Sequence, residues 1–478
     1  MNLLPLVMIP FALGQAEPTI PDTPNGRFLT QFLATVNSGD PATIRKFAER
    51  LGNDDLLGLH AENHALLLQK LYQQSGGLKL ERVRPDGGAC IVKSRIGDRT
   101  IILEAGLNAA GKGEYGIMRG AENSLTRTYS WPKNPAGKGG VVKAVGAYLD
   151  ALAKEDLWNG VVLIAQGDRV LLHTAHGLAD RGLGVKIRKD TKINLASLGK
   201  MFTATLVGEL VQEGKVSLDD PLGKFRPEWP DVAAREKVTL GMLLSHTAGL
   251  GSLFQSPNYD RARRYTDATD MTSALVGEPL GFEPGKGWSY SNGGYVMLGS
   301  IVEKVLGMPY ETAVRERVFR PLGMVSSGWA DGNEALPNCA ALYDRDLMDP
   351  LGLEPKRRDG MFAGWRGGPH GGGYSTAEDL FRFGRALRTH RLMSEATTKR
   401  FFTVSEPAKG PRYALGFVQE DINGMLNVGH NGHARADLGV LWDLDVTVIA
   451  LGNDLSEPTP RVARMIREYI VKNAATFR

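Results

Sequence analysis

The stretch SLGKMFTATLVGELVQEG, residues 197–214, places a hydroxyl and an amine three positions apart at the start of a long apolar run. The run is apolar around much of its surface and predicts a buried helix that ends near Gly214. Side chains at i and i+3 lie on one helix face, so we expect Lys200 to reach the hydroxyl of Ser197. A lysine can activate a serine only when burial or a nearby cation lowers its pKa from ~10.4.

A second Ser-x-x-Lys sequence, Ser130-Trp131-Pro132-Lys133, tests how specific this spacing is. It lies in a segment rich in proline and glycine, which predicts a linker with no helix to align the two side chains. Ser197 and Lys200 are therefore the better candidates. Taken alone, their spacing is also compatible with a core helix whose first turn contains a serine and a lysine.

Tyr290-Ser291-Asn292 is the only Tyr-x-Asn sequence in the chain and lies in a glycine-rich segment before a helical run, residues 295–306. The pKa of a phenol falls near a lysine ammonium, and the phenol can then relay a proton between a nucleophile and a leaving group. We expect Asn292 to hold either Lys200 or a substrate amide. The alternative is an ordinary turn with one aromatic anchor.

His430-Asn431-Gly432 precedes two β-rich stretches, residues 438–442 and 446–451, and is therefore expected at a strand edge. A basic residue, a small polar residue and a glycine would put positive charge at a cleft wall and let backbone approach a substrate closely. His370-Gly371-Gly372 is a competing match, but it falls in a glycine-rich loop. A lone histidine is also often a structural residue.

In chain order, the three sequences resemble the active-site motifs of serine hydrolases related to class C β-lactamases and penicillin-binding proteins. This superfamily also contains D-alanyl-D-alanine carboxypeptidases, D-aminopeptidases and family VIII esterases. The resemblance extends from about Trp158 to about Val471 and is also carried by residues 160–168, 243–250 and 371–380. It implies the α+β architecture of β-lactamase and transpeptidase folds, an antiparallel sheet flanked by helices plus an all-helical region.

Carried over to this chain, the resemblance implies that Ser197 forms an acyl-enzyme. Lys200 and Tyr290 would share the base and acid roles, and which of them takes the first proton stays open. His430 would support Tyr290 electrostatically. The chemistry implied by the resemblance uses no metal and no other cofactor.

The resemblance also implies the residues that bind substrate. Asn292 would orient the substrate, and Asn431, Gly432 and His433 would flank it along the strand. Backbone N–H groups of Ser197 and of a residue near His433 would form an oxyanion hole. Each such donor contributes on the order of 3 kcal/mol in the transition state.

The third motif departs from the Lys-Thr-Gly or Lys-Ser-Gly usual in β-lactamases. His430 is largely neutral at pH 7 by its unperturbed pKa of ~6.5, and Asn431 replaces a hydroxyl. We therefore expect this motif to bind a β-lactam carboxylate more weakly than the β-lactamase motif does. Arg435 is expected either to restore an anion anchor or to lie at the surface. We therefore expect a small ester, amide or peptide substrate. The alternatives are a penicillin-binding sensor or scaffold without useful turnover and a true β-lactamase.

Two further residues invite catalytic assignments that the sequence does not favour. His246 suggests a catalytic triad, but its segment, residues 243–250, resembles a structural turn of the same superfamily. Ser375 and Glu378 have the spacing of a capping box at the start of a helix. We therefore expect His246 to be structural and Ser375 to be a helix cap.

The segment before the hydrolase region predicts a second, smaller domain. Helical patterns are followed by three strand patterns, which predicts a small α+β domain at residues 24–130 that resembles the nuclear-transport-factor fold. Residues 131–145 are predicted to be a linker, and residues 146–478 the hydrolase domain. The predicted helices are residues 26–36, 41–51 and 63–74, and the strands are residues 78–83, 89–94 and 100–105.

Composition predicts a soluble globular protein. The chain has 478 residues, of which 42% are hydrophobic and 23% charged, with a net charge of +4. So small an excess, without a basic run or interleaved aromatic residues, excludes a nucleic-acid partner. The sequence does not indicate an oligomeric state.

Residues 1–16 resemble a secretory signal peptide, with an apolar run before Gly14-Gln15-Ala16. No lysine or arginine precedes that run, and Pro5 and Pro10 interrupt it, which weakens the resemblance. We expect a periplasmic or secreted protein, with the cytoplasm as the alternative. No stretch reaches the ~18 apolar residues of a transmembrane helix.

Overall fold

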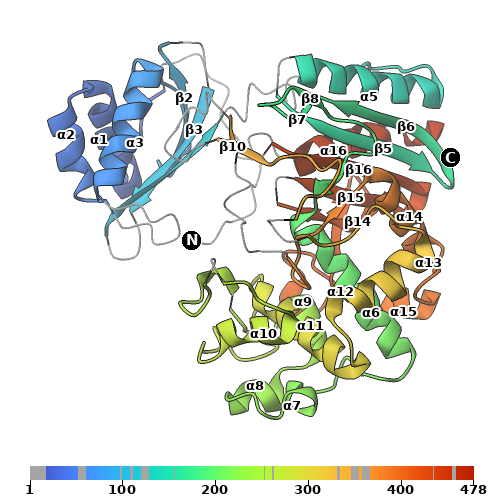
Figure 1. Cartoon of the computed structure of the whole chain (residues 1–478). Coiled ribbons are helices and arrows are strands. Elements are labelled where there is room, and N and C mark those ends of the chain that lie inside the picture. Colours follow the sequence, from blue (N-terminus) through green and yellow to red (C-terminus); the bar gives the residue numbers. More distant parts are fainter. Residues whose placement is uncertain are drawn as a thin grey trace. The chain divides into compact units, whose positions relative to one another are not determined.

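The computed structural model (Figure 1) contains two compact units. The N-terminal unit comprises Met1–Tyr129 and Arg345–Lys356, and the larger unit comprises Ser130–Asp344 and Arg357–Arg478. The candidate signal peptide lies outside the described residues. Within the chain, the structure describes residues 18–51, 61–96, 100–107, 111–119, 129–154, 157–251, 253–260, 263–330, 334–345, 355–357, 367–433, 435–454 and 459–478.

The N-terminal unit has three helices followed by a four-stranded antiparallel sheet in the order β1-β2-β3-β4. The predicted helices and three strands are confirmed, and β4, interrupted by Gly113 and Gly116 in sequence, was not predicted. The nuclear-transport-factor likeness and the domain bounds stay predictions. The elements are α1 (Pro24–Ser38), α2 (Pro41–Ala48), α3 (Ala61–Ser75), β1 (Leu78–Val83), β2 (Ala89–Ser94), β3 (Thr100–Leu107) and β4 (Gly113–Arg119).

Two helices of this unit begin with the same local signal. Thr23 precedes Pro24 in α1 and Asp40 precedes Pro41 in α2, and each polar side chain accepts a backbone N–H from the first turn. Proline suits the first helical position because its fixed φ is helical and its missing N–H would have no partner there. The same Pro-containing signal therefore marks both starts, although the first helix begins two residues before its predicted range, residues 26–36.

The larger unit is built on a six-stranded antiparallel sheet in the order β13-β14-β15-β16-β5-β6. Two adjacent inner strands, β16 and β5, are buried along nearly their whole length, and they come from opposite ends of the unit's sequence. The antiparallel sheet implied by the resemblance and the strands expected from the β-rich stretches, residues 438–442 and 446–451, are confirmed. The strands are β5 (Gly160–Gln166), β6 (Arg169–His176), β13 (Val418–Ile422), β14 (Met425–Gly432), β15 (Ala436–Leu441) and β16 (Val446–Gly452).

Helices cover both faces of this sheet (Figure 1). The α16 helix (Thr459–Lys472) packs on the face that carries Asp437, together with α5 (Gly137–Lys154). The α14 helix (Ala377–Arg388) packs on the opposite face, which carries Leu438. Neighbouring residues of a strand point to opposite faces, so the sheet is sandwiched between two helical layers.

A helical region adjoins the second face and contains α6 (Lys200–Gln212) and α11 (Asn292–Leu306) at its centre. Both helices are buried along most of their length, as the apolar run after Ser197 predicts. The other helices are α7 (Leu222–Phe225), α8 (Val232–Lys237), α9 (Leu240–Ser245), α10 (Ala268–Met271), α12 (Tyr310–Val314), α13 (Arg320–Leu322) and α15 (Glu395–Phe401). Short strands are β7 (Leu178–Asp180), β8 (Val185–Lys186), β9 (Ile193–Asn194), β10 (Tyr343–Arg345), β11 (Pro355–Arg357) and β12 (Tyr374–Ser375).

Two local predictions are wrong. The predicted linker, residues 131–145, overlaps α5, because the glycines taken as breakers lie in the first turn of a helix whose apolar residues from Val141 onward are buried. The cap of α14 is Thr376, which accepts the N–H of Asp379, because the helix begins at Ala377. Ser375 belongs to β12 and contacts the hydroxyl of Ser327 instead.

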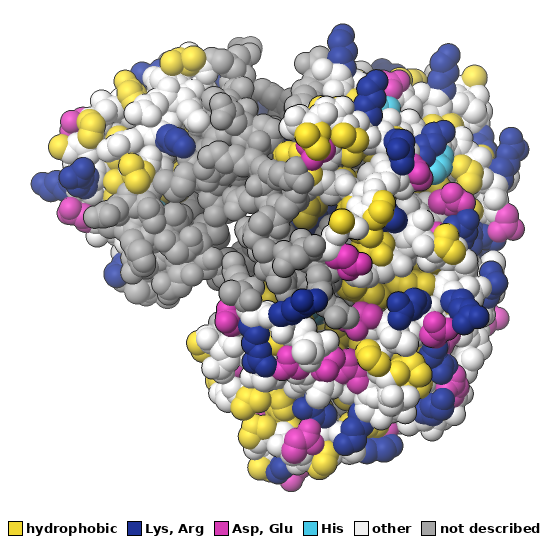
Figure 2. All heavy atoms as spheres, in the orientation of Figure 1, with side chains coloured by type: hydrophobic (Ala, Val, Ile, Leu, Met, Phe, Trp, Pro, Cys, Tyr) yellow, Lys and Arg dark blue, Asp and Glu magenta, His cyan; other side chains and the backbone are white. Residues whose placement is uncertain are grey.

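Charges of both signs are intermixed over the larger unit on the face shown in Figure 2. This distribution fits the small net charge of the chain. Among the helices of the described residues, none has the length and hydropathy needed to cross a bilayer.

A buried ion pair joins α16 to the sheet. Arg467 contacts Asp437 of β15, and their side chains are only 2% and 7% exposed. Arg467 also lies 3.5 Å from Glu420 of β13. Since a charge left alone in such a site would be costly, these contacts hold the helix against β13 and β15.

We expect Asp437→Ala to lower the free energy of unfolding by about 3–5 kcal/mol, because it leaves Arg467 charged and buried without its main partner. Urea unfolding measures this loss. Glu406→Ala is the control, since Glu406 and Lys409 form an exposed pair and exposed pairs contribute about 1 kcal/mol or less. Equal, small losses in both variants would contradict this account of Arg467.

Candidate active site

Ser197 lies in a tight turn between β9 and α6. The turn is a 3-10 helix, Ala196–Gly199, and α6 begins at Lys200. Ala196 has a φ of 45°, a left-handed conformation that non-glycine residues seldom adopt. The side chain of Ser197 is partly exposed while Lys200 is buried. The candidate nucleophile, Ser197, is therefore accessible to solvent, while the amine beside it is buried.

Three oxygen atoms surround the Lys200 amine. Its Nζ lies 3.3 Å from Oγ of Ser197 and 2.7 Å from Oδ1 of Asn292, and it contacts the backbone carbonyl of His370. The two carbonyl oxygens can only accept hydrogen bonds. In a neutral amine they take both N–H groups, so the remaining lone pair faces the hydroxyl of Ser197.

The surroundings of Lys200 favour that neutral form. The residue is 0% exposed. The ring faces of Tyr290 and Tyr295, whose centres lie 4.7 Å and 5.3 Å from Nζ, would attract an ammonium, but burial has the larger effect. Burial holds the pKa of Lys200 well below its ordinary value, because transfer of an ammonium out of water is unfavourable. The predicted reach of Lys200 to Ser197, and the lowered pKa it requires, are both found.

The second motif forms the start of α11. Ser291 caps that helix by accepting the N–H of Gly294, which places Tyr290 just outside the helix and Asn292 at its first position. Burial raises the pKa of the Tyr290 phenol, and the neighbouring hydroxyl of Ser197 opposes this shift. The phenol therefore keeps its proton at neutral pH. Of the two roles predicted for Asn292, the structure supports contact with Lys200.

His246 supports the loop that carries Tyr290. Its Nδ1 accepts the backbone N–H of Ser291 at 3.1 Å, and its ring lies 4.3 Å from the ring of Tyr290. Burial and the neighbouring Lys200 hold the pKa of His246 well below its usual range. These contacts give His246 the structural role that was predicted for it, because they hold the loop that carries Tyr290.

The third motif lies at the end of β14, with His433 immediately after the strand at a φ of 50°. His430 is buried and Asn431 is exposed. Burial, with Lys200 acting in the same direction, lowers the pKa of His430 to about 3. The positive charge expected at the cleft wall is therefore missing at neutral pH. The neighbour that His430 contacts is Tyr413, whose hydroxyl lies 2.9 Å from Nε2.

Gly432 lets β14 approach the nucleophile. A Cβ at this position would lie 1.9 Å from the carbonyl oxygen of Leu195, two residues before Ser197. Beyond the strand, Arg435 donates to Oδ1 of Asn194, which also accepts the N–H of Ala196. Arg435 is only 3% exposed, so it is neither a surface residue nor a free anion anchor. Instead it joins the strand end to the turn of Ser197.

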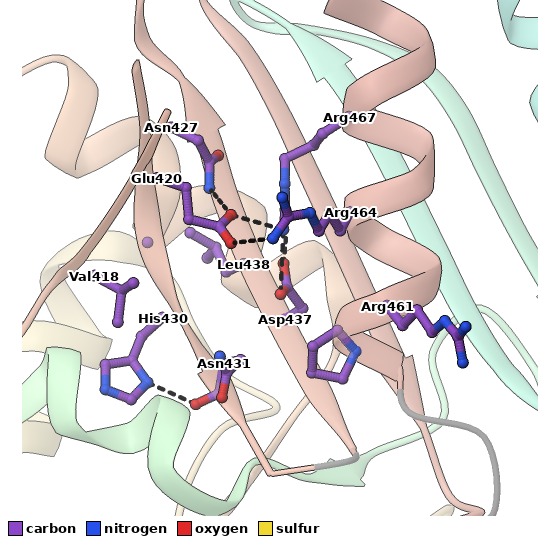
Figure 3. A pocket seen from close by; sticks show the side chains of 12 residues that line it. Val418, Glu420, Asn427, His430, Asn431, Asp437, Leu438, Arg461, Arg464 and Arg467 are labelled. Atoms are coloured by element: carbon purple, nitrogen blue, oxygen red, sulfur yellow. Dashed lines mark hydrogen bonds and ion pairs between the residues drawn. The ribbon is translucent and has the colours of Figure 1, made fainter. Parts of the chain in front are cut away.

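A cavity of about 230 Å³ lies beside the third motif (Figure 3). It is lined by His430 and Asn431 and by the charged residues of the interface between α16 and the sheet. Asn431 and Asp437 are opposite each other in the register of β14 and β15, so Asn431 points to this face. Within the described part of the chain, no group of three or more His, Cys, Asp or Glu side chains is placed to hold a metal ion.

Several contacts of the site were not predicted from the sequence. The carbonyl of His370 completes the shell of Lys200, although His370 was rejected because it lies in a glycine-rich loop. Asn194 and Tyr413 were not singled out. A backbone carbonyl leaves no side-chain pattern, and neither polar residue belongs to a recognisable motif. The groups around Lys200 and Ser197 can together activate the Ser197 hydroxyl for attack on a carbonyl carbon.

Comparison with known proteins places this arrangement in context. The family model described as Beta-lactamase matches residues 148–470. Esterase EstB of Burkholderia gladioli is 30% identical over 318 residues, which cover 59% of this chain and 80% of the esterase. A crystal structure of a penicillin-binding protein from Bacillus halodurans has a TM-score of 0.58 at 25% identity, over 67% of this chain and 99% of that chain.

A second solved structure, of a D-stereospecific amidohydrolase from a Streptomyces species, has a TM-score of 0.56 at 25% identity. The match covers 69% of this chain and 97% of that chain. The predicted β-lactamase and transpeptidase fold is confirmed. The N-terminal unit lies outside the residues that the family model matches.

We expect Gly432→Ala to slow the reaction of Ser197 with a fluorophosphonate probe by ~10², because the added methyl pushes β14 away from the turn that carries the nucleophile. The rate of covalent labelling measures this effect. Gly410→Ala is the control, since a Cβ there would meet no atom within 4 Å. Unchanged labelling in Gly432→Ala would show that the close approach of β14 is not needed.

The rate of the same labelling should rise with pH as Lys200 loses its proton, since only the neutral amine can accept the proton of Ser197. Because burial lowers the pKa of Lys200, we expect the rate to level off well below pH 10. Lys200→Arg should stay unlabelled across this range, because a guanidinium keeps its charge. Lys133→Arg, in the exposed second Ser-x-x-Lys sequence, should label like the wild type. A rise centred near pH 10 would contradict a lowered pKa.

Proposed function

Because this chain belongs to the beta-lactamase family of serine hydrolases, we propose that it cleaves small esters or amides through a covalent acyl-enzyme on Ser197. The observation that carries the proposal is the Lys200 amine, whose two N–H groups face carbonyl oxygens while its third direction faces Oγ of Ser197. A general base must lie within hydrogen-bond reach of the proton it removes. Lys200 meets that condition.

We assign the first proton transfer to Lys200 rather than to Tyr290. Burial moves the two pKa values apart, downward for the amine and upward for the phenol. A neutral amine and a protonated phenol form a base and an acid at the same pH. Ser197 then attacks the substrate carbonyl carbon as its proton passes to Lys200, and Tyr290 gives its proton to the leaving group.

The second half of the reaction restores both groups. The Lys200 ammonium lies over the Tyr290 ring and stabilises the phenolate that the first half leaves behind. Water attacks the acyl-enzyme and gives a proton to the phenolate, while Lys200 returns its proton to Oγ of Ser197. The products are a carboxylic acid and an alcohol or amine. The roles of Asn431, Gly432 and His433 along the substrate are part of the same proposal.

An ester or small amide suits the third motif better than a β-lactam. The uncharged His430 and the exposed amide of Asn431 give a substrate carboxylate no cation at the position where a motif lysine would provide one. The matched relatives described as an esterase and an amidohydrolase support these substrate classes. Relatives described as penicillin-binding proteins support the alternative of a sensor that acylates without turnover.

Steady-state release of nitrophenol from a short-chain ester tests the proposal, with a chromogenic cephalosporin in parallel. We expect sustained ester turnover, its loss in Ser197→Ala, and a fall of ~10² in Tyr290→Phe. Ser130→Ala is the matched control, because that exposed serine belongs to the second Ser-x-x-Lys sequence. It should retain wild-type turnover.

The competing functions predict different time courses of product release in this assay. A sensor would release one equivalent of product per enzyme molecule and then stop, because its acyl-enzyme does not turn over. Fast cephalosporin hydrolysis would identify a β-lactamase. Full ester turnover by Ser197→Ala would refute the assignment of the nucleophile.

A further inference from the structure

Tyr413 lies outside the three motifs, yet its side chain contacts two of the elements that build the site. It is 3% exposed, and its hydroxyl lies 2.9 Å from Nε2 of His430. Its ring centre lies 4.4 Å from that of His246 and 6.2 Å from that of Tyr290. The residue therefore connects the strand of the third motif with the loop of the second.

The hydrogen bonds of His430 fix which nitrogen carries its proton. Nδ1 lies 2.6 Å from the backbone oxygen of Asn431, which can only accept, so Nδ1 carries the proton. In a neutral ring Nε2 is then an acceptor, and the Tyr413 hydroxyl must donate to it. Burial raises the pKa of Tyr413 well above its ordinary value, so the phenol keeps the proton that it donates.

We propose that Tyr413 is a positioning residue for the active-site edge of β14: its hydroxyl orients the His430 ring, whose Nδ1–H in turn fixes the carbonyl of Asn431. This inference rests on the proposed function, since the fixed peptide group flanks the substrate of Ser197. In this arrangement His430 neither accepts the serine proton nor supplies a charge. His430 links the Tyr413 hydroxyl to the backbone of β14 through its two ring nitrogens.

Rotation of the Asn431 peptide group would shift the turn that carries Ser197. The next residue, Gly432, packs so tightly that a Cβ there would reach the carbonyl oxygen of Leu195. Leu195 directly precedes the turn of Ser197. A small misplacement of reacting groups can cost ~10² in rate, so the orientation of this peptide matters for turnover.

The titratable groups around His430 favour its neutral form. Lys200 of α6 and His246, the residue that follows α9, act on it electrostatically from the helical region. The carboxylates Glu420 and Asp437 lie on the other face of the sheet and pair with Arg467. A charged His430 would be unfavourable beside Lys200 once that amine takes the serine proton. The donated hydroxyl of Tyr413 also occupies the only nitrogen of the ring that could accept a further proton.

A double-mutant cycle on ester turnover tests whether Tyr413 acts through His430. We expect Tyr413→Phe, which keeps the ring, to lower kcat by ~10-fold with little change in KM. In the His430→Leu background the same change should have no further effect. The matched control is Tyr469→Phe, which removes the hydroxyl of a buried tyrosine in α16 that donates to the carbonyl of Pro132. Its effect should multiply with that of His430→Leu.

A full 10-fold loss from Tyr413→Phe in the His430→Leu background would overturn the proposal, because Tyr413 would then act independently of the imidazole. So would wild-type kcat in Tyr413→Phe.

Nitrogen NMR of protein labelled with 15N-histidine provides a readout that needs no turnover. The His430 signals are identified by their loss in His430→Leu. We expect a protonated Nδ1 and an unprotonated Nε2 between pH 5 and 8, and a shifted Nε2 resonance in Tyr413→Phe but not in Tyr469→Phe. A wild-type ring protonated at Nε2, or an Nε2 resonance unaffected by Tyr413→Phe, would refute the proposed hydrogen bond. If the ester assay shows no turnover, the proposed function fails while this measurement still decides the contact.

Discussion

The burial of one amine governs the rest of the site. Burial strongly disfavours an ammonium at the position of Lys200. The neutral amine is accommodated there because two carbonyl oxygens accept its N–H groups. Those oxygens come from the first residue of α11 and from a glycine-rich loop far along the chain. The nucleophile, the acid and the third strand are all arranged around this constraint, since each must reach the amine or the serine above it.

Close backbone approach is the second requirement, and glycine meets it from two sides. Gly432 brings β14 against the residue before the nucleophile turn, and Gly371 brings the glycine-rich loop against the carbonyl of Ala196. A side chain at either position would collide with that turn. The turn itself is held by Asn194 and Arg435 through hydrogen bonds that join β9 to the end of β15.

The residues that carry chemistry could be predicted from the sequence, whereas the residues that hold them could not. Ser197, Lys200 and Tyr290 belong to short motifs with fixed spacing, and the periodic apolar run after Ser197 correctly predicts α6. The His370 carbonyl has no side-chain signal, because any residue type can provide it. Helix starts such as Pro24 follow local rules, while the start of α5 was missed because glycines can begin a helix as well as break one. The pairing of Tyr413 with His430 depends on tertiary packing, which local patterns do not encode.

The pairing of β16 with β5 has a consequence for how the protein is made. These two paired strands are separated in the chain by the whole helical region, and β14 follows Ser197 by more than two hundred residues. During synthesis the nucleophile therefore emerges long before the strand that completes its surroundings, and contacts between such distant segments form slowly. Catalytic competence is thus one of the last properties the growing chain acquires, and a chain that stops before β14 contains Ser197 and Lys200 without an active site.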